Sequence, residues 1–231
     1  MSYINENKSS YDEIYKKGWG NQYPNSNMIS YYFNYIKPLL QARGGVERKL
    51  KMLDFGCSIG ANTRFFAEQG FEVYGIDISE IAIARCIERN KFPEDHFKAL
   101  NILDYNDLGM VFGTKFDLIV ASEVLYYFDK KDAGTLLELF NGSLAENGII
   151  YANWVTFNMD FYRKYKKPDL CMGQIKVSNT GSIGEDLNVY VVENKQEIEE
   201  MFHVFDTKYI KSTCLELDGE NESIHYIGVK K

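Results

Sequence analysis

The stretch Lys51-Met-Leu-Asp-Phe-Gly-Cys-Ser-Ile-Gly-Ala-Asn-Thr63 decides the fold of this chain. An apolar run over 50–55 precedes glycines at 56 and 60, and a helical pattern begins near Ala61. This order predicts a buried strand, a tight turn and a helix. Glycine lets a ligand approach the backbone, and the first turn of a helix offers unpaired N–H groups. The junction is therefore predicted to hold a nucleotide-like molecule.

The composition of the chain limits its class. It has 231 residues, of which 45% are hydrophobic, and this suits one substantial core. A net charge of -7 argues against nucleic acid as a partner, because phosphate contacts need a basic face. The 4 cysteines form no C-x-x-C pair, so we expect neither a bound metal nor a disulfide framework. Without an apolar leader or a run of roughly 18 apolar residues, we expect a cytoplasmic protein with no membrane partner.

Strands and helices alternate after the opening junction. Apolar runs predict strands at 50–55, 71–77, 97–103, 116–121 and 149–155. Near-continuous apolar strands with helices between them indicate a parallel sheet that is covered on both faces. Two last runs, 207–217 and 223–229, flank a turn sequence and predict an antiparallel hairpin at the edge of the sheet.

We expect one domain over residues 1–231, because no repeat or low-complexity linker interrupts the chain. Its parts are a helical N-terminal layer at 1–45, a ligand-binding core at 46–155, a substrate-side insertion at 156–190, and a helix with the terminal hairpin at 191–231. The aromatic-rich start of the chain is too polar for a core helix. We interpret it as a lid over the ligand, with a surface helix as the alternative.

Ligands of open α/β sheets bind at the carboxyl ends of the strands. Those ends supply the glycine turn, Asp77, Asn101-Ile102 and Ser122-Glu123. Asp77 is predicted to lie beside the turn, where its carboxylate can accept both hydroxyls of a ribose. The plainer interpretation of Asp77 is an acid that stabilises a helix N-terminus.

The glycine turn fits two other templates less well. The dinucleotide pattern G-x-G-x-x-G fails, because Ser58 and Ala61 stand where glycines should be. The run Gly56-Cys57-Ser58-Ile59-Gly60 matches the G-x-S-x-G nucleophile elbow of a serine hydrolase. A hydrolase has several strands before its elbow, whereas almost no strand precedes residue 50 in this chain. The base of a catalytic triad would have to be His203 or His225, and neither lies in an obvious strand-end loop. The hydrolase is therefore the weaker hypothesis.

A third template fits both the turn and the later strands. Asp54-Phe-Gly-Cys-Ser-Ile-Gly60 resembles the first motif, D-x-G-x-G-x-G, of the class I S-adenosylmethionine-dependent methyltransferases. Phe116-Asp-Leu-Ile-Val-Ala-Ser-Glu-Val-Leu-Tyr-Tyr-Phe128 resembles their fourth-strand motif, nearest to the branch with nodulation N-methyltransferases and sugar-modifying enzymes. The resemblance implies an α/β, Rossmann-like, doubly wound, mainly parallel seven-stranded sheet with an antiparallel C-terminal hairpin. The sequence adds an N-terminal helical lid.

The resemblance also implies a cofactor and the residues that bind it. The cofactor is S-adenosyl-L-methionine, with S-adenosyl-L-homocysteine as the product. The cofactor-binding residues that it implies are Asp54, Gly56, Cys57, Gly60, Asp77, Ile78, Asn101, Ile102 and Ser122. Two positions depart from the pattern: Ser58 replaces the central glycine, and Tyr127 stands where many members carry a histidine. A family histidine base therefore cannot be transferred to this chain.

The implied reaction is methyl transfer to an O or N atom of a small-molecule acceptor, and the hypothesis for that acceptor is a sugar or a surface-polysaccharide precursor. The proposed catalytic residues are Glu123 and Tyr127, and the proposed substrate-binding residues are Trp19, Tyr23, Tyr126 and Tyr162. Glu123 has a plainer role as a helix-start acid, and the tyrosines have one as packing. A non-catalytic cofactor-binding protein is the alternative function, and the chain is expected to be a monomer or homodimer.

Overall fold

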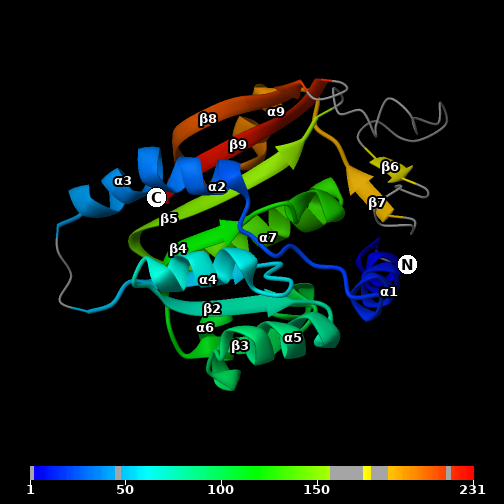
Figure 1. Ribbon diagram of the computed structural model, residues 1–231. Helices are drawn as coiled ribbons and strands as arrows, with labels where there is room; N and C mark the ends of the chain where they lie inside the picture. Colours follow the sequence, from blue (N-terminus) through cyan, green and yellow to red (C-terminus); the bar gives the residue numbers. More distant parts are fainter. Residues whose placement is uncertain (1–2, 45–47, 157–173, 178–186, 217–219) are drawn as a thin grey trace.

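The opening strand β1 (Lys51–Phe55) lies inside a sheet and pairs in parallel with β2 (Glu72–Asp77) and β4 (Phe116–Ala121). The computed structural model describes residues 3–44, 48–156, 174–177, 187–216 and 220–231. Within these residues one sheet has the seven-strand order β3-β2-β1-β4-β5-β9-β8 (Figure 1). The inner strands β1, β2 and β4 are buried along nearly their whole length, because both of their faces are covered.

The remaining strands complete the sheet on either side. β3 (Phe97–Ala99) pairs in parallel with β2, and β5 (Leu144–Val155) pairs in parallel with β4. β9 (Glu220–Lys230) is antiparallel to β5, and β8 (Phe205–Glu216) pairs with β9 at the edge of the sheet. This arrangement confirms the predicted doubly wound, mainly parallel sheet and its antiparallel terminal hairpin.

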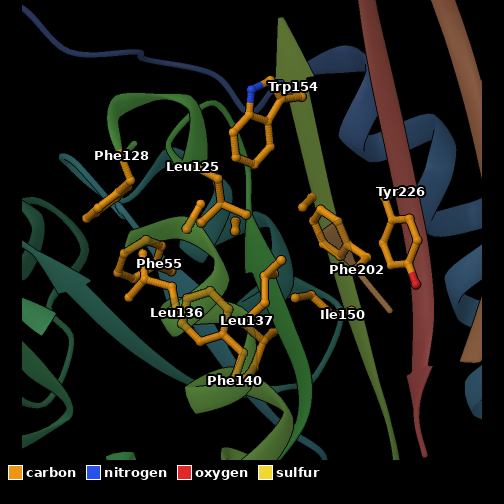
Figure 2. Close-up of a cluster of buried hydrophobic side chains, with 14 of the residues drawn as sticks. Phe55, Leu125, Phe128, Leu136, Leu137, Phe140, Ile150, Trp154, Phe202 and Tyr226 are labelled. Atoms are coloured by element: carbon orange, nitrogen blue, oxygen red, sulfur yellow. The ribbon is translucent and has the colours of Figure 1, made fainter. Parts of the chain in front are cut away.

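Helices pack on both faces of the sheet (Figure 1). One face is covered by α2 (Ser26–Tyr31), the π-helical turn η1 (Tyr32–Ile36), α3 (Lys37–Ala42), α4 (Ala61–Glu68) and α5 (Glu80–Asn90). The other face is covered by α6 (Leu108–Phe112), α7 (Lys130–Ser143) and α9 (Lys195–Met201). The side chains between α7, α9 and the sheet are large and fully buried, as Phe140, Phe202 and Trp154 show (Figure 2).

The first helix, α1 (Tyr3–Lys16), stands apart from these layers and contacts α5, β7 (Leu187–Tyr190) and the short turn η4 (Leu125–Tyr127). β7 pairs with β6 (Gln174–Val177) in a separate two-stranded sheet. After α1, the chain enters α2, whose N-cap is Asn25. The Asn25 side chain accepts hydrogen bonds from the N–H groups of Asn27 and Met28. The predicted helical N-terminal layer is thus α1 followed by the α2–η1–α3 run.

Three local expectations differ from the structure. The third strand ends at Ala99 and not near 103, because the Asn101 side chain accepts a hydrogen bond from Leu103 N and starts the turn η3 (Ile102–Asp104). The segment between the predicted strands 97–103 and 116–121, for which the sequence predicts no helix or strand, contains α6, which is capped by Asp107. β5 begins at Leu144, because the turn residues before Ile149 form an irregularity inside the strand and not a break before it.

Part of the expected insertion at 156–190 lies outside the described residues, and Tyr162 is among the residues that are not described. The division of residues 1–231 into four parts of one domain stays a prediction. Among the described residues, no helix is both long enough and apolar enough to cross a membrane.

Candidate functional site

A cavity of about 330 Å³ opens at the carboxyl ends of β1, β2 and β4. Its floor is the glycine turn that follows β1, and its far wall is α1 together with the segment that leads to α2. Residues that the sequence places at the ends of different strands therefore line one cavity. Those that line it and enter the argument below are Lys8, Tyr11, Tyr15, Trp19, Asn25, Gly56, Cys57, Ser58, Asn62, Asp77, Ile78, Ile102, Ser122, Glu123, Tyr126 and Tyr127.

The glycine turn is held in a left-handed conformation at Gly56 (φ 73°), Ser58 (φ 50°) and Gly60 (φ 82°). A Cβ atom at Gly56 would lie 2.6 Å from Val124 Cγ2, so this glycine is required by close packing as well as by its φ angle. Ser58 keeps the backbone shape of the glycine that it replaces in the resemblance. Its buried hydroxyl lies near Tyr15 and makes no hydrogen bond of good geometry with any described residue.

Asp77 closes β2 directly against this turn. Its Oδ2 accepts a hydrogen bond from Ser58 N at 2.9 Å, and its Oδ1 accepts one from Ser79 N at 3.0 Å. Burial raises the pKa of the Asp77 carboxyl to about 6, although these backbone donors oppose the shift. The side chain still borders the cavity, so a ligand hydroxyl can add to the backbone donors.

The other predicted cofactor-binding residues divide into two groups. Gly56, Cys57, Asp77, Ile78, Ile102 and Ser122 line the cavity, whereas Asp54, Gly60 and Asn101 do not. Asp54 is 1% exposed and lies beneath the turn, where its Oδ2 accepts a hydrogen bond from Thr63 Oγ1 at 2.6 Å. Burial raises the pKa of the Asp54 carboxyl to about 7. The position of Asp54 suits support of the turn more than ligand contact, and the individual roles stay predictions.

Glu123 follows β4 in a left-handed conformation (φ 59°). Its backbone N–H donates to Asn153 Oδ1 at 2.6 Å, and its Oε1 accepts from Asn25 Nδ2 at 2.7 Å. The side chain is open to the solvent of the cavity, yet protein atoms surround the carboxylate. This desolvation raises the pKa of the Glu123 carboxyl above its usual range, and the Asn25 hydrogen bond partly offsets the shift.

Tyrosine rings form the wall next to Glu123. Tyr11 meets Tyr127 edge-on with 5.4 Å between ring centroids, and Tyr126 lies 4.6 Å from Tyr127. Burial raises the pKa of all three hydroxyls, so they are neutral at ordinary pH. Among the predicted substrate residues, Trp19 and Tyr126 line the cavity, while Tyr23 is 80% exposed and lies outside it.

The α1 wall is anchored to α5. Arg85 donates from Nη1 to the carbonyl oxygens of Tyr15 (3.1 Å) and Trp19 (2.8 Å), and from Nη2 to that of Gly18 (3.2 Å). Asp12 adds a second anchor, because its Oδ1 accepts a 2.5 Å hydrogen bond from the Ser79 hydroxyl. These contacts place α1 over the same strand end that carries Asp77.

The sequence interpretation missed several cavity residues. Asn25, the N-cap of α2, also binds Glu123 and donates from its backbone N to Asn62 Oδ1 at 3.1 Å. Lys8 and Tyr15 on α1 line the cavity as well. The signal for Tyr15 was present, because Tyr11 and Tyr15 are four residues apart and share one face of a helix. Nothing in the sequence placed Lys8 or Asn62 there.

The hydrolase alternative lacks its base. No histidine lines the cavity among the described residues. His225 is buried against Tyr151, whose hydroxyl lies 2.9 Å from its Nδ1, and His203 is exposed with its Nδ1 3.2 Å from Glu200 O. Ser58 therefore has no histidine that could activate it.

Comparison with known proteins agrees with the resemblance stated above. Residues 53–150 match the family described as a methyltransferase domain. An uncharacterized protein of Rickettsia prowazekii (strain Madrid E) is 32% identical over 158 residues, which is 65% of this chain and 59% of that protein. The chain therefore matches less than two thirds of the length of this relative.

Solved structures show the same fold. A SAM-dependent methyltransferase from Methanosarcina mazei superposes with a TM-score of 0.65 at 19% identity, covering 82% of this chain and 96% of that one. The N-methyltransferase NodS from Bradyrhizobium japonicum WM9, in complex with S-adenosyl-l-homocysteine, gives 0.60 at 19% identity and covers 96% and 98%. Magnesium protoporphyrin IX methyltransferase from Synechocystis PCC 6803 with bound SAH gives 0.63 at 15% identity and covers 99% of both chains. These identities show a shared fold alone.

Proposed function

Because residues 53–150 match the family described as a methyltransferase domain and the chain has the fold of solved methyltransferases, we propose that this protein transfers a methyl group from S-adenosylmethionine to an O or N atom of a small-molecule acceptor. One observation carries the proposal: a single cavity joins Asp77, at the glycine turn, to Glu123, at the end of β4. A carboxylate that suits a ribose and a second carboxylate that suits an acceptor then lie in one space.

The residues present fit this cofactor. The glycine turn leaves Gly56, Cys57 and Ser58 on the cavity surface, and the buried Ser58 hydroxyl has unused hydrogen-bonding capacity there. Asp77 offers carboxylate oxygens at the end of the neighbouring strand. Ile102 contributes an apolar wall on the side of η3, which suits a flat aromatic base.

Each residue has a stated task in this proposal. Asp77 accepts hydrogen bonds from the ribose hydroxyls, Ile78 and Ile102 pack against the base, and backbone groups of Gly56, Cys57 and Ser122 orient the amino-acid part. When bound, S-adenosylmethionine supplies a methyl group that is activated by a positively charged sulfur. Alignment and exclusion of water then contribute most to the rate.

Glu123 and Tyr127 are the proposed catalytic residues, because both face the cavity at the end of β4. Glu123 holds or receives the proton of the acceptor, and the neutral Tyr127 hydroxyl orients it. Trp19 and Tyr126 are proposed to contact the acceptor. Aromatic rings in the same cavity as the side-chain amides of Asn25 and Asn62 suit a sugar, so a sugar or surface-polysaccharide precursor is the acceptor class that we propose.

α1 is proposed to act as the lid of this site, because it forms one wall of the cavity and is anchored beside Asp77. The cytoplasm is the proposed location. Among the described residues, Cys57, Cys86 and Cys214 are free thiols, which suits a reducing compartment.

Turnover tests the function directly. The purified protein is incubated with methyl-labelled S-adenosylmethionine and a panel of nucleotide sugars and small phosphorylated sugars, with the Asp77→Ala variant as the control. We expect label to enter at least one acceptor and to fall in the variant. Cofactor binding without transfer to any acceptor would favour the non-catalytic alternative, and absence of cofactor binding would contradict the proposal.

A further inference from the structure

Glu123, at the acceptor end of the cavity, has no cationic partner within the part of the chain that the structure describes. Among the described residues that line the cavity, the acids are Asp77 and Glu123, and Lys8 is the single basic residue. No ion pair of the described residues involves Glu123; its carboxylate has the Asn25 amide as its partner, at 2.7 Å. A desolvated carboxylate is costly unless a cation or several donors compensate for it.

The two cavity acids differ in the number of hydrogen-bond donors that the protein supplies to their carboxylates. Asp77 receives backbone N–H donors on both carboxylate oxygens, so the fold itself compensates for its charge. Glu123 receives its one side-chain hydrogen bond on Oε1, and its Oε2 has no partner among the described residues. The backbone of Glu123 is fixed by its hydrogen bond to Asn153, in a conformation that few residues other than glycine adopt. Among the described residues, the Glu123 carboxylate therefore has one hydrogen-bond partner and no ion-pair partner, and its backbone holds it in a defined place.

The surroundings of Glu123 favour a cation over a neutral hydroxyl. Tyr126 and Tyr127 follow Glu123 closely in the chain and line the same cavity. Tyrosine ring faces attract ammonium groups, and their neutral hydroxyls can accept hydrogen bonds from them. A carboxylate beside several tyrosine rings is thus suited to an ammonium group.

We propose that the acceptor is an amine, and that it binds as an ammonium ion between the Glu123 carboxylate and the rings of Tyr126 and Tyr127. This inference rests on the proposed function and narrows its O-or-N alternative to nitrogen. The ammonium supplies a positive charge beside the Glu123 carboxylate, and the Asn25 amide holds the carboxylate in position to receive it.

The bound ammonium must lose a proton before its nitrogen can act as a nucleophile. One N–H bond breaks, its electron pair stays on the nitrogen, and the proton forms an O–H bond with a Glu123 carboxylate oxygen. Because this side chain is open to the solvent of the cavity, the proton can then pass to water. An alcohol could donate one hydrogen bond to the Glu123 carboxylate, but it carries no positive charge that would compensate it.

The test uses two probes of nearly equal shape, benzylamine and benzyl alcohol, with protein saturated with S-adenosylhomocysteine. Their affinities are measured by calorimetry or ligand-observed NMR near neutral pH, where benzylamine is a cation. Three proteins are compared: the wild type, Glu123→Gln, and Glu138→Gln. The last removes the same charge from the exposed surface of α7, outside the cavity.

We expect benzylamine to bind wild-type protein at least about tenfold more tightly than benzyl alcohol, Glu123→Gln to abolish this preference, and Glu138→Gln to keep it. The affinity for S-adenosylhomocysteine should stay within about twofold in Glu123→Gln. Equal binding of the probes, no binding of either, or a preference that survives Glu123→Gln would overturn the inference. So would a large loss of cofactor affinity in Glu123→Gln, because the carboxylate would then serve the cofactor. Failure of the wild type to bind S-adenosylhomocysteine would instead overturn the proposed function.

Discussion

The Asp77 carboxylate accepts a hydrogen bond from the backbone N–H of Ser58 at 2.9 Å, and so ties the end of β2 to the glycine turn after β1. The same carboxylate borders the cavity, where we propose that it binds a ribose. One side chain therefore shapes the turn and serves the ligand.

Replacing Asp77 by alanine should weaken S-adenosylmethionine binding by about 1.5–3 kcal/mol, because charge-assisted hydrogen bonds are lost. This corresponds to roughly a 10- to 150-fold increase in Kd, measured by calorimetry. Asp77→Asn is the matched control, because it keeps one acceptor oxygen and should lose less affinity. Unchanged binding in Asp77→Ala would rule out the ribose role.

Ser58 adopts a left-handed conformation with φ 50°. Such a conformation costs an L-residue about 1–2 kcal/mol of folding stability. Glycine avoids this cost, but its greater freedom in the unfolded chain lowers folding stability by about 0.5–1 kcal/mol. Ser58→Gly should thus change the free energy of unfolding by less than about 1 kcal/mol, whereas Ser58→Val should lower it by about 1–3 kcal/mol. Urea unfolding of both variants measures this. Equal stability of the two would show that the turn does not need its left-handed backbone.

Asp54 makes stability depend on pH. Its pKa is raised by burial from 3.8 to about 7, so the contribution of this carboxyl to stability is complete at low pH and is lost as the pH rises through about 7. Asp54→Asn removes the titrating group. The stability of the variant relative to the wild type should therefore be higher at pH 8 than at pH 5, by about 1–3 kcal/mol.

Chemical unfolding of both proteins at the two pH values checks this difference. The other buried carboxyl of the site, Asp77, titrates in both proteins and largely cancels in the comparison. A relative stability that does not change with pH would mean that Asp54 is ionised at no cost in the folded protein.

Arg85 anchors the wall of the cavity through three backbone carbonyls at the end of α1. Arg85→Ala should speed dissociation of S-adenosylhomocysteine by about 3- to 10-fold, because losing about 1 kcal/mol of anchoring increases the opening of α1 by a similar factor. Stopped-flow fluorescence of Trp19, which lines the cavity, can follow this release. The control is Glu88→Ala, an exposed change on the same helix. Dissociation that is as slow as in the wild type would contradict the lid role.

The fold was largely predictable, because its signals are local. Apolar runs ending at Phe55, Asp77 and Ala121 predict buried strands, and Ser79 marks the start of α5 as its N-cap. The boundaries failed where side chains decide them. Asn101 ends β3 by capping the next turn, a competition between side chain and strand that the apolar pattern does not reveal.

The cavity was only partly predictable. Strand ends meet at one edge of a parallel sheet, so Asp77 and Glu123 were expected together. The side-chain partner of Glu123 comes from a distant part of the chain: Asn25 lies 98 residues before Glu123 and binds it through tertiary packing alone. No periodicity in the sequence reports such a contact, which is why the sequence does not place Asn25 beside Glu123.

The most direct test of this account is calorimetric titration of the purified protein with S-adenosylmethionine and with S-adenosylhomocysteine. We predict that both bind at a single site, and that Asp77→Ala weakens both by a similar factor. If neither compound bound the folded wild-type protein, the assignment of this cavity to a methyltransferase cofactor would be wrong.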